Sequence, residues 1–341
     1  MAAMASRYDA LVVVSFGGPE GMEDVLPFLR NVVRGRGVPD QRLREVAAHY
    51  RHFGGRSPIN DQCRALVAAV QQELERCGPR MPVYWGNRNW HPLLADTLRQ
   101  MAGDGVARAL AFVTSAFGSY PGCRQYLEDI ARARAEVGEN APEVDKLRLF
   151  YNHPGYVEPL VDSVRAALEK VEAGRRGQAR LVFTAHSLPL ALARTSPYEA
   201  QVRECASLVA AALVRDFSLA WQSRSGPPGQ PWLEPDVVDH LRRLAADGVR
   251  DVVVSPIGFV SDHMEVLYDL DLDARSRALE MGIRLVRAAT VGTHPRFVRM
   301  VRELVEERME DAPVRAGLGG QGPAPDVCAP GCCPPPAARG A

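Results

Sequence analysis

The chain has 341 residues, of which 46% are hydrophobic and 24% are charged. This balance is typical of a globular protein with a buried core, and the length suits two domains of ordinary size. Lysine plus arginine and aspartate plus glutamate each number 41, so no net charge draws the protein to nucleic acid or acidic membranes. The sequence shows neither an apolar stretch long enough to span a membrane nor a secretory signal, which predicts a cytoplasmic protein.

Short apolar runs rich in β-branched residues alternate along the chain with longer amphipathic stretches. Several runs are continuously apolar, as is typical of parallel strands covered on both faces. In chain order the expected strands are 10–16, 83–86, 109–114, 147–151, 181–185, 251–256 and 284–289. The expected helices include 58–76, 159–172, 199–216, 234–246 and 294–307. This alternation predicts an α/β fold built on parallel sheets.

The expected strands are too many for one compact sheet, so we expect two similar domains. The first would cover residues 7–149 and the second 150–293, with a helix at 294–309 packing back on the first. Ligands of such folds bind beyond the carboxyl ends of the strands, which predicts a cleft between the domains. Residues 313–341 are rich in Gly, Pro and Cys without periodicity, so this tail cannot form a core of its own.

A histidine, His186, follows the expected strand 181–185. At the carboxyl edge of a parallel sheet, a neutral imidazole can accept a proton near pH 7 or bind Fe²⁺. The alternative is a histidine that only hydrogen-bonds to a neighbouring loop.

Three acidic residues, Glu265, Asp269 and Asp273, are spaced four apart after the expected strand 251–256 and would share one face of a helix. Like charges at this spacing repel by about 0.2–0.5 kcal/mol per pair, yet such a stripe could lead a cation along the helix. The alternative is capping, with Asp262 and Glu265 forming a capping box. Capping does not account for Asp269 and Asp273.

Two loops combine glycine with arginine, at residues 34–37 and 54–58. Their backbone N–H and guanidinium groups could hold an anion, although such loops can also be merely solvated.

Seven cysteines in a large chain without a secretory signal favour free thiols or metal ligands over a disulfide framework. Cys328, Cys332 and Cys333 supply three of the four thiolates that a [2Fe–2S] cluster or a structural zinc requires. Cys123, just after an expected strand, is the best-placed fourth ligand. The alternative is a loose tail with free thiols. The others, Cys63, Cys77 and Cys205, are expected in the core.

Six segments, taken together and in this order, resemble the ferrochelatase family over residues 8–307. They are 15–19 (SFGGP), 54–59 (GGRSPI), 86–92 (GNRNWHP), 184–189 (TAHSLP), 221–223 (WQS) and 261–265 (SDHME). The GNRNW variant is most similar to the actinobacterial members, whose substrate is generally coproporphyrin III.

The resemblance implies two Rossmann-like domains and an enzyme that inserts Fe²⁺ into coproporphyrin III to give coproheme. It implies that His186 and Glu265 face each other across a slot wide enough for a macrocycle and handle the metal and the pyrrole protons. The resemblance also implies that Fe²⁺ reaches this pair by way of Asp269 and Asp273.

The resemblance also places Ser57, Tyr126, Tyr50 and Arg34 where coproporphyrin enzymes contact the propionates. Phe16 falls where many relatives carry a tyrosine that ligates the product iron, which phenylalanine cannot do. Cys123 and the three tail cysteines match the ligands of a [2Fe–2S] cluster in actinobacterial relatives.

Other functions remain open. The chain could act on protoporphyrin IX or another tetrapyrrole, or it could be a bilobal protein that binds haem or a metal without turnover. The resemblance also leaves room for transient contacts with neighbouring enzymes of haem biosynthesis.

Overall fold

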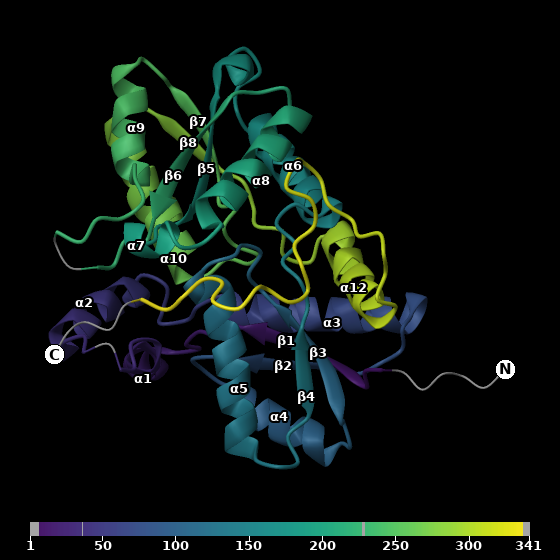
Figure 1. The fold of residues 1–341 in the computed structure, drawn as a ribbon. Coiled ribbons are helices and arrows are strands. Elements are labelled where there is room, and N and C mark those ends of the chain that lie inside the picture. Colours follow the sequence, from purple (N-terminus) through teal and green to yellow (C-terminus); the bar gives the residue numbers. More distant parts are fainter. Residues whose placement is uncertain (1–6, 36, 227–228, 337–341) are drawn as a thin grey trace.

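The computed structural model describes residues 7–35, 37–226 and 229–336. The chain forms two α/β lobes, each built on a four-stranded parallel sheet (Figure 1). The N-terminal sheet has the order β2-β1-β3-β4 and the C-terminal sheet the order β6-β5-β7-β8, so both lobes share one topology. The strands are β1 (Ala10–Ser15), β2 (Val83–Asn87), β3 (Arg108–Val113), β4 (Glu143–Lys146), β5 (Arg180–His186), β6 (Phe217–Gln222), β7 (Asp251–Ser255) and β8 (Arg284–Arg287). The predicted α/β fold with two parallel sheets is confirmed.

Helices flank both sheets (Figure 1). In the N-terminal lobe they are α1 (Met22–Val32), α2 (Asp40–Arg51), α3 (Ile59–Cys77), α4 (Leu94–Gly103), the π-helix η1 (Tyr120–Arg124) and α5 (Gln125–Val137). The remaining helices are α6 (Pro154–Glu169), the 3₁₀ turn η2 (Arg176–Gln178), α7 (Leu190–Ala193), α8 (Tyr198–Ala212), α9 (Val237–Ala246), α10 (Met264–Val266), the π-helix η3 (Leu267–Ala274), α11 (Arg275–Glu280) and α12 (Pro295–Met309). None of the helices in the described part of the chain is long and apolar enough to cross a bilayer.

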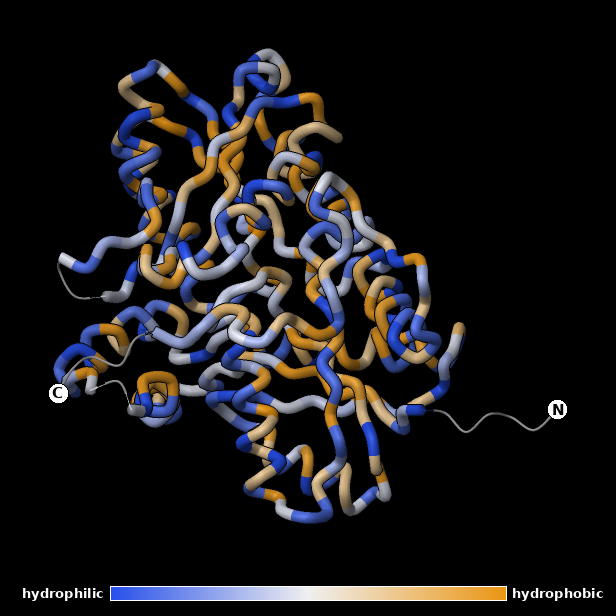
Figure 2. The backbone as a smooth tube through the Cα atoms, viewed as in Figure 1, coloured by the Kyte–Doolittle hydropathy of each residue, from blue (hydrophilic) through white to orange (hydrophobic). Residues whose placement is uncertain are grey.

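The apolar strands are buried because helices cover both of their faces. Along β1, Val12 and Val14 pack with the core under α4 and α5, while Leu11 and Val13 belong to a larger core that includes α3. Full burial of each such side chain stabilises the fold by about 1.5–3 kcal/mol. Figure 2 shows the resulting apolar runs along the strands of both lobes.

The larger core continues from one lobe into the other. It includes Phe112 on β3, Phe183 on β5 and Phe297 on α12. Helix α12 packs on both α3 and α6, whereas the sequence predicts packing on the first domain. The two lobes are therefore joined by a shared apolar core as well as by the chain.

Some predicted elements are wrong or incomplete. Residues 147–151 form no strand, because the fourth strand of the N-terminal sheet is the charged segment β4 just before them. Strand β6 was not predicted, since its sequence FSLAWQ lacks a continuous apolar run. Cys77, expected in the core, is exposed at the end of α3.

The tail at 313–336 has no helix or strand but runs along both lobes, as the yellow trace in Figure 1 shows. The Asn152 side chain donates a hydrogen bond to the carbonyl of Gly322 at 2.7 Å. The Glu204 carboxylate on α8 accepts one from the backbone N–H of Gly320 at 2.9 Å. Polar contacts to the body thus hold a segment that cannot fold alone.

Two adjacent glycines in the 54–59 motif allow a direct test of local packing. Both Gly54 and Gly55 have positive φ, at 63° and 79°. A Cβ on Gly54 would meet open space, whereas one on Gly55 would collide with the backbone of Met22. We expect Gly54→Ala to cost about 1–2 kcal/mol, from the left-handed backbone alone. Gly55→Ala should cost a further 1–3 kcal/mol through overpacking. Urea unfolding midpoints measure the difference, and equal midpoints would contradict the packing shown here.

Candidate active site

His186 is the last residue of β5 and follows the buried residues 181–185 of that strand. Its Nδ1 lies 2.6 Å from the backbone oxygen of Ser187. Because a carbonyl can only accept, Nδ1 carries the proton in this bond, and Nε2 is the ring nitrogen that faces other partners. The Tyr198 hydroxyl donates to the backbone oxygen of His186 at 3.0 Å and holds the end of the strand.

Glu265 lies opposite this imidazole, with its Oε2 3.5 Å from Nε2 of His186. Burial disfavours the imidazolium, but the carboxylate outweighs burial and raises the pKa of His186 to about 9. Burial likewise disfavours the carboxylate, and the imidazolium outweighs it and lowers the pKa of Glu265 to about 2. The two groups therefore form an ion pair near neutral pH in the metal-free protein.

This ion pair is too close to match the slot implied by the family resemblance. Both residues belong to the C-terminal lobe, and no macrocycle fits between atoms 3.5 Å apart. A macrocycle would have to lie over the pair rather than between its members. The side chain of Glu265 is 51% exposed, so a ligand can reach it.

The start of the acidic helix differs from the expected capping box. His263 is the N-cap residue, and its Nδ1 accepts a hydrogen bond from the backbone N–H of Glu265 at 3.2 Å. The Asp262 carboxylate is instead 3.0 Å from the guanidinium of Arg287. The backbone N–H of Asp262 donates to the Gln62 side chain on α3 at 2.8 Å, which ties this loop to the N-terminal lobe. Helix capping therefore accounts for neither the Asp262 nor the Glu265 carboxylate.

Asp269 and Asp273 follow Glu265 along the π-helix η3. Burial raises the pKa of Asp269 to about 7, helped by the charge of Glu265 and opposed by a hydrogen bond from Ser223. Asp273 is further from the ion pair in sequence, and its side chain is 46% exposed and 3.6 Å from Arg277. Both Glu265 and Asp273 are thus about half exposed, and of the three acids only Asp269 has a pKa raised by burial.

The N-terminal lobe meets this helix through α2. The ring of His49 stacks on Tyr268 of η3, with centroids 3.9 Å apart and an interplanar angle of 5°. Tyr50 is buried, and burial together with the Glu265 charge raises the pKa of its hydroxyl. The ion pair thus lies where residues of both lobes come together.

Phe16 and Tyr126, two of the predicted substrate contacts, both lie close to Arg88. The Arg88 guanidinium is 4.3 Å from the Tyr126 ring centroid and 5.8 Å from that of Phe16. It also pairs with buried Asp129 at 2.5 Å. Phe16 is 37% exposed, but Tyr126 is buried beneath the guanidinium. Sequence reasoning assigned no role to Arg88, although it stands in the GNRNWHP segment.

The other predicted propionate contacts differ in exposure. Ser57 is buried, and its backbone N–H donates to the carbonyl of Pro19 at 2.9 Å. Arg34 is exposed and donates to the Asn31 side chain at 2.7 Å. Arg36, in the same loop, lies outside the described residues.

The four candidate cluster ligands come from η1 and the tail. The thiol of buried Cys123 donates to Cys328, and this bond lowers the pKa of Cys328. Cys332 donates to Cys333 at 3.5 Å, and Cys332 also interacts with Cys328. In the described ranges, however, no three His, Cys, Asp or Glu side chains are arranged to hold a metal ion. The thiols are neighbours in a hydrogen-bonded arrangement.

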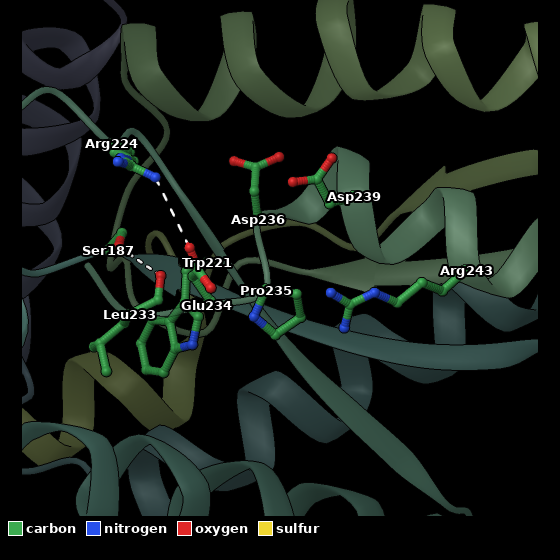
Figure 3. A pocket seen from close by; sticks show the side chains of 9 residues that line it. All are labelled: Ser187, Trp221, Arg224, Leu233, Glu234, Pro235, Asp236, Asp239 and Arg243. Carbon is green, nitrogen blue, oxygen red and sulfur yellow. Dashed lines mark hydrogen bonds and ion pairs between the residues drawn. The ribbon is translucent and has the colours of Figure 1, made fainter. Parts of the chain in front are cut away.

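A separate pocket lies at the ends of β5 and β6 (Figure 3). Asp236, the N-cap residue of α9, accepts a hydrogen bond from the backbone N–H of Val238 at 2.8 Å. Burial raises the pKa of Asp236, and the charges of Asp239 and Asp273 add to this effect. The residues that line this pocket are Ser187, Trp221, Arg224, Leu233, Glu234, Pro235, Asp236, Asp239 and Arg243.

Comparison with known proteins gives a consistent result. The family model described as Ferrochelatase matches residues 8–309. A protein of Nocardia farcinica named coproporphyrin III ferrochelatase is 56% identical over 97% of this chain and 99% of its own length. A Rhodopirellula baltica protein named ferrochelatase is 52% identical over 96% of this chain and 93% of its own length.

Among solved structures, the sirohydrochlorin chelatase SirB of Bacillus subtilis, in complex with cobalt, has a similar fold. Its TM-score is 0.54 at 11% identity, over 89% of this chain and 96% of that chain. At this identity the likeness concerns the fold alone.

The ion pair can be tested in the metal-free protein. Removing the carboxylate by Glu265→Gln leaves burial opposed only by the Ser187 hydrogen bond and the charge of Asp269, so the pKa of His186 should fall well below about 9. An NMR titration of the His186 ring measures this change, with Glu199→Gln, at an exposed carboxylate on α8, as the control. An unchanged pKa in Glu265→Gln would show that the two side chains do not pair.

Proposed function

Because the chain belongs to the ferrochelatase family, we propose that it is the cytoplasmic enzyme that inserts Fe²⁺ into coproporphyrin III to form coproheme in haem biosynthesis. The contact between His186 and Glu265 carries this proposal. It combines a base and a carboxylate at the junction of the lobes, as metal insertion requires. The relative from Nocardia farcinica, 56% identical, supports the choice of porphyrin by its name.

Insertion removes two N–H protons from the porphyrin and water from the metal. Nδ1 of His186 is held by Ser187, and Nε2 carries the second proton of the imidazolium in the metal-free protein. Once the arriving Fe²⁺ has displaced that proton to water, Nε2 is the atom that contacts the metal or accepts a pyrrole proton. Glu265 stabilises the imidazolium that results and offers an oxygen ligand to the metal. Asp269 and Asp273 would conduct Fe²⁺ along the helix to this pair.

A flat macrocycle hides its nitrogen lone pairs, so the site must hold the substrate bent. Binding energy from the periphery can supply such distortion. We assign this binding to Arg34, Ser57, Tyr50 and Tyr126, which would contact the propionates. Phe16 would pack against the macrocycle without ligating the product iron.

We also propose that the chain binds a [2Fe–2S] cluster, although the described side chains are not arranged here to hold a metal ion. The donor set suits the group, because four cysteine thiolates are its usual ligands and four thiols are neighbours here. Cys123, Cys328, Cys332 and Cys333 would hold it, and the bound group would supply one-electron redox chemistry. Ligation would also stabilise the position of the tail, because it would link the three tail cysteines to Cys123 on η1.

The rate of iron insertion distinguishes a coproporphyrin III enzyme from a protoporphyrin IX enzyme and from a carrier protein. An anaerobic assay with Fe²⁺ should convert free coproporphyrin III to its iron complex faster than protoporphyrin IX. Faster conversion of protoporphyrin IX would overturn the choice of substrate. Stoichiometric binding without conversion would instead indicate a carrier protein.

His186→Ala should abolish insertion while leaving the dissociation constant of coproporphyrin III nearly unchanged. The reason is that the variant loses the proton acceptor but keeps the groups that bind the periphery. Fluorescence quenching of the porphyrin measures binding alongside the assay. A parallel loss of binding and turnover would contradict the assigned role.

Protein purified without oxygen should be brown and contain iron and sulfide in about equal amounts. Cys123→Ser should bleach it, whereas Cys77→Ser, at an exposed thiol outside the set, should not. Colourless protein with about one zinc ion would show that the four thiols form a zinc site instead.

A further inference from the structure

The segment Trp221-Gln222-Ser223 has no role in the reaction described so far, yet it contacts both members of the site. Gln222 ends β6 beside His186, its register partner on β5. Its backbone oxygen accepts a hydrogen bond from the N–H of Ser187 at 2.8 Å. Its buried side chain donates to the backbone oxygen of Glu265 at 3.2 Å. Gln222 therefore links the end of the sheet to the start of the acidic helix.

The next residue, Ser223, adopts a left-handed backbone conformation with φ of 63°. Non-glycine residues rarely occupy this region, and doing so costs about 1–3 kcal/mol. The turn directs the Ser223 hydroxyl to Oδ2 of Asp269, to which it donates a hydrogen bond. An unfavourable backbone conformation is thus kept at a point where it brings a donor to the acidic helix.

The Ser223 hydroxyl that donates to Asp269 is neutral, whereas a neighbouring acid on the same helix has a charged donor. Asp271 accepts a charged hydrogen bond from Arg287 at 2.7 Å. Arginine neutralises the carboxylate that it holds, whereas a hydroxyl fixes a carboxylate without supplying positive charge. The Asp269 carboxyl is therefore fixed in orientation by a neutral group rather than by a cation.

We propose that Ser223 is a positioning residue that aims the Asp269 carboxylate toward the ion pair of His186 and Glu265 and thereby sets how readily Fe²⁺ reaches that pair. This inference rests on the proposed function and assigns to the β6 turn a part in metal delivery. It does not require Ser223 to touch the metal or the porphyrin.

Three substitutions distinguish the effect of losing the Ser223 hydroxyl from the effect of its unfavourable backbone conformation. Ser223→Gly removes the hydroxyl and accepts positive φ freely, whereas Ser223→Ala removes it and keeps the unfavourable backbone. Ser223→Asn tolerates this conformation and restores a neutral donor. Ser218→Ala is the matched control, because Ser218 lies on β6 and its hydroxyl bonds to His240 at 2.7 Å.

Anaerobic initial rates at varied Fe²⁺ and saturating coproporphyrin III provide the measurement. Ser223→Gly and Ser223→Ala should raise the KM for Fe²⁺ about tenfold, the value expected for losing a hydrogen bond to a charged group. We expect kcat and the dissociation constant of coproporphyrin III to remain within about twofold of the wild type. Ser223→Asn should recover most of the change in KM, and Ser218→Ala should show none.

A wild-type KM for Fe²⁺ in Ser223→Gly would overturn the inference. So would a parallel loss of porphyrin binding, or a Ser223→Asn variant no better than Ser223→Gly. Thermal melting identifies variants that lose activity by unfolding, and Ser223→Gly is expected to remain as stable as the wild type. If the wild type itself inserts no iron, the proposed function fails, whereas an active wild type with an unaffected Ser223→Gly rejects only the role of Ser223.

Discussion

The ion pair between His186 and Glu265 is the interaction on which the proposed site depends. Each group is partly withdrawn from water, which would discharge either one alone, and each keeps its charge because the other is 3.5 Å away. The pair exists because the end of β5 and the start of α10 meet at one edge of the C-terminal sheet. An incoming divalent cation would replace the imidazolium proton as the partner of Glu265. Proton release and metal binding are therefore coupled at one place.

The two lobes provide the frame that holds this pair. They share an apolar core, and α12 packs on helices of both lobes. Around the pair, the contacts are more specific: His49 stacks on Tyr268, and the backbone N–H of Asp262 donates to Gln62. A substrate bound between the lobes would thus meet groups whose positions depend on both sheets.

The fold was predictable from the sequence because buried parallel strands leave continuous apolar runs. His186 and the acidic stripe were also recognisable, since one follows such a run and the other has helical spacing. Strands β4 and β6 carry no such run, so their places depend on pairing with β3 and β5. The partners of Asp262 and Tyr126 were not predictable either, because Arg287 and Arg88 reach them only through the tertiary fold.

The most direct test is the structure of the protein with coproporphyrin III bound. The account predicts that the macrocycle lies between the lobes, over the ion pair, with a pyrrole nitrogen in hydrogen-bonding reach of Nε2 of His186 and with Phe16 against the ring. A macrocycle bound elsewhere, for example near the pocket of Figure 3 with His186 out of reach of every pyrrole nitrogen, would contradict it.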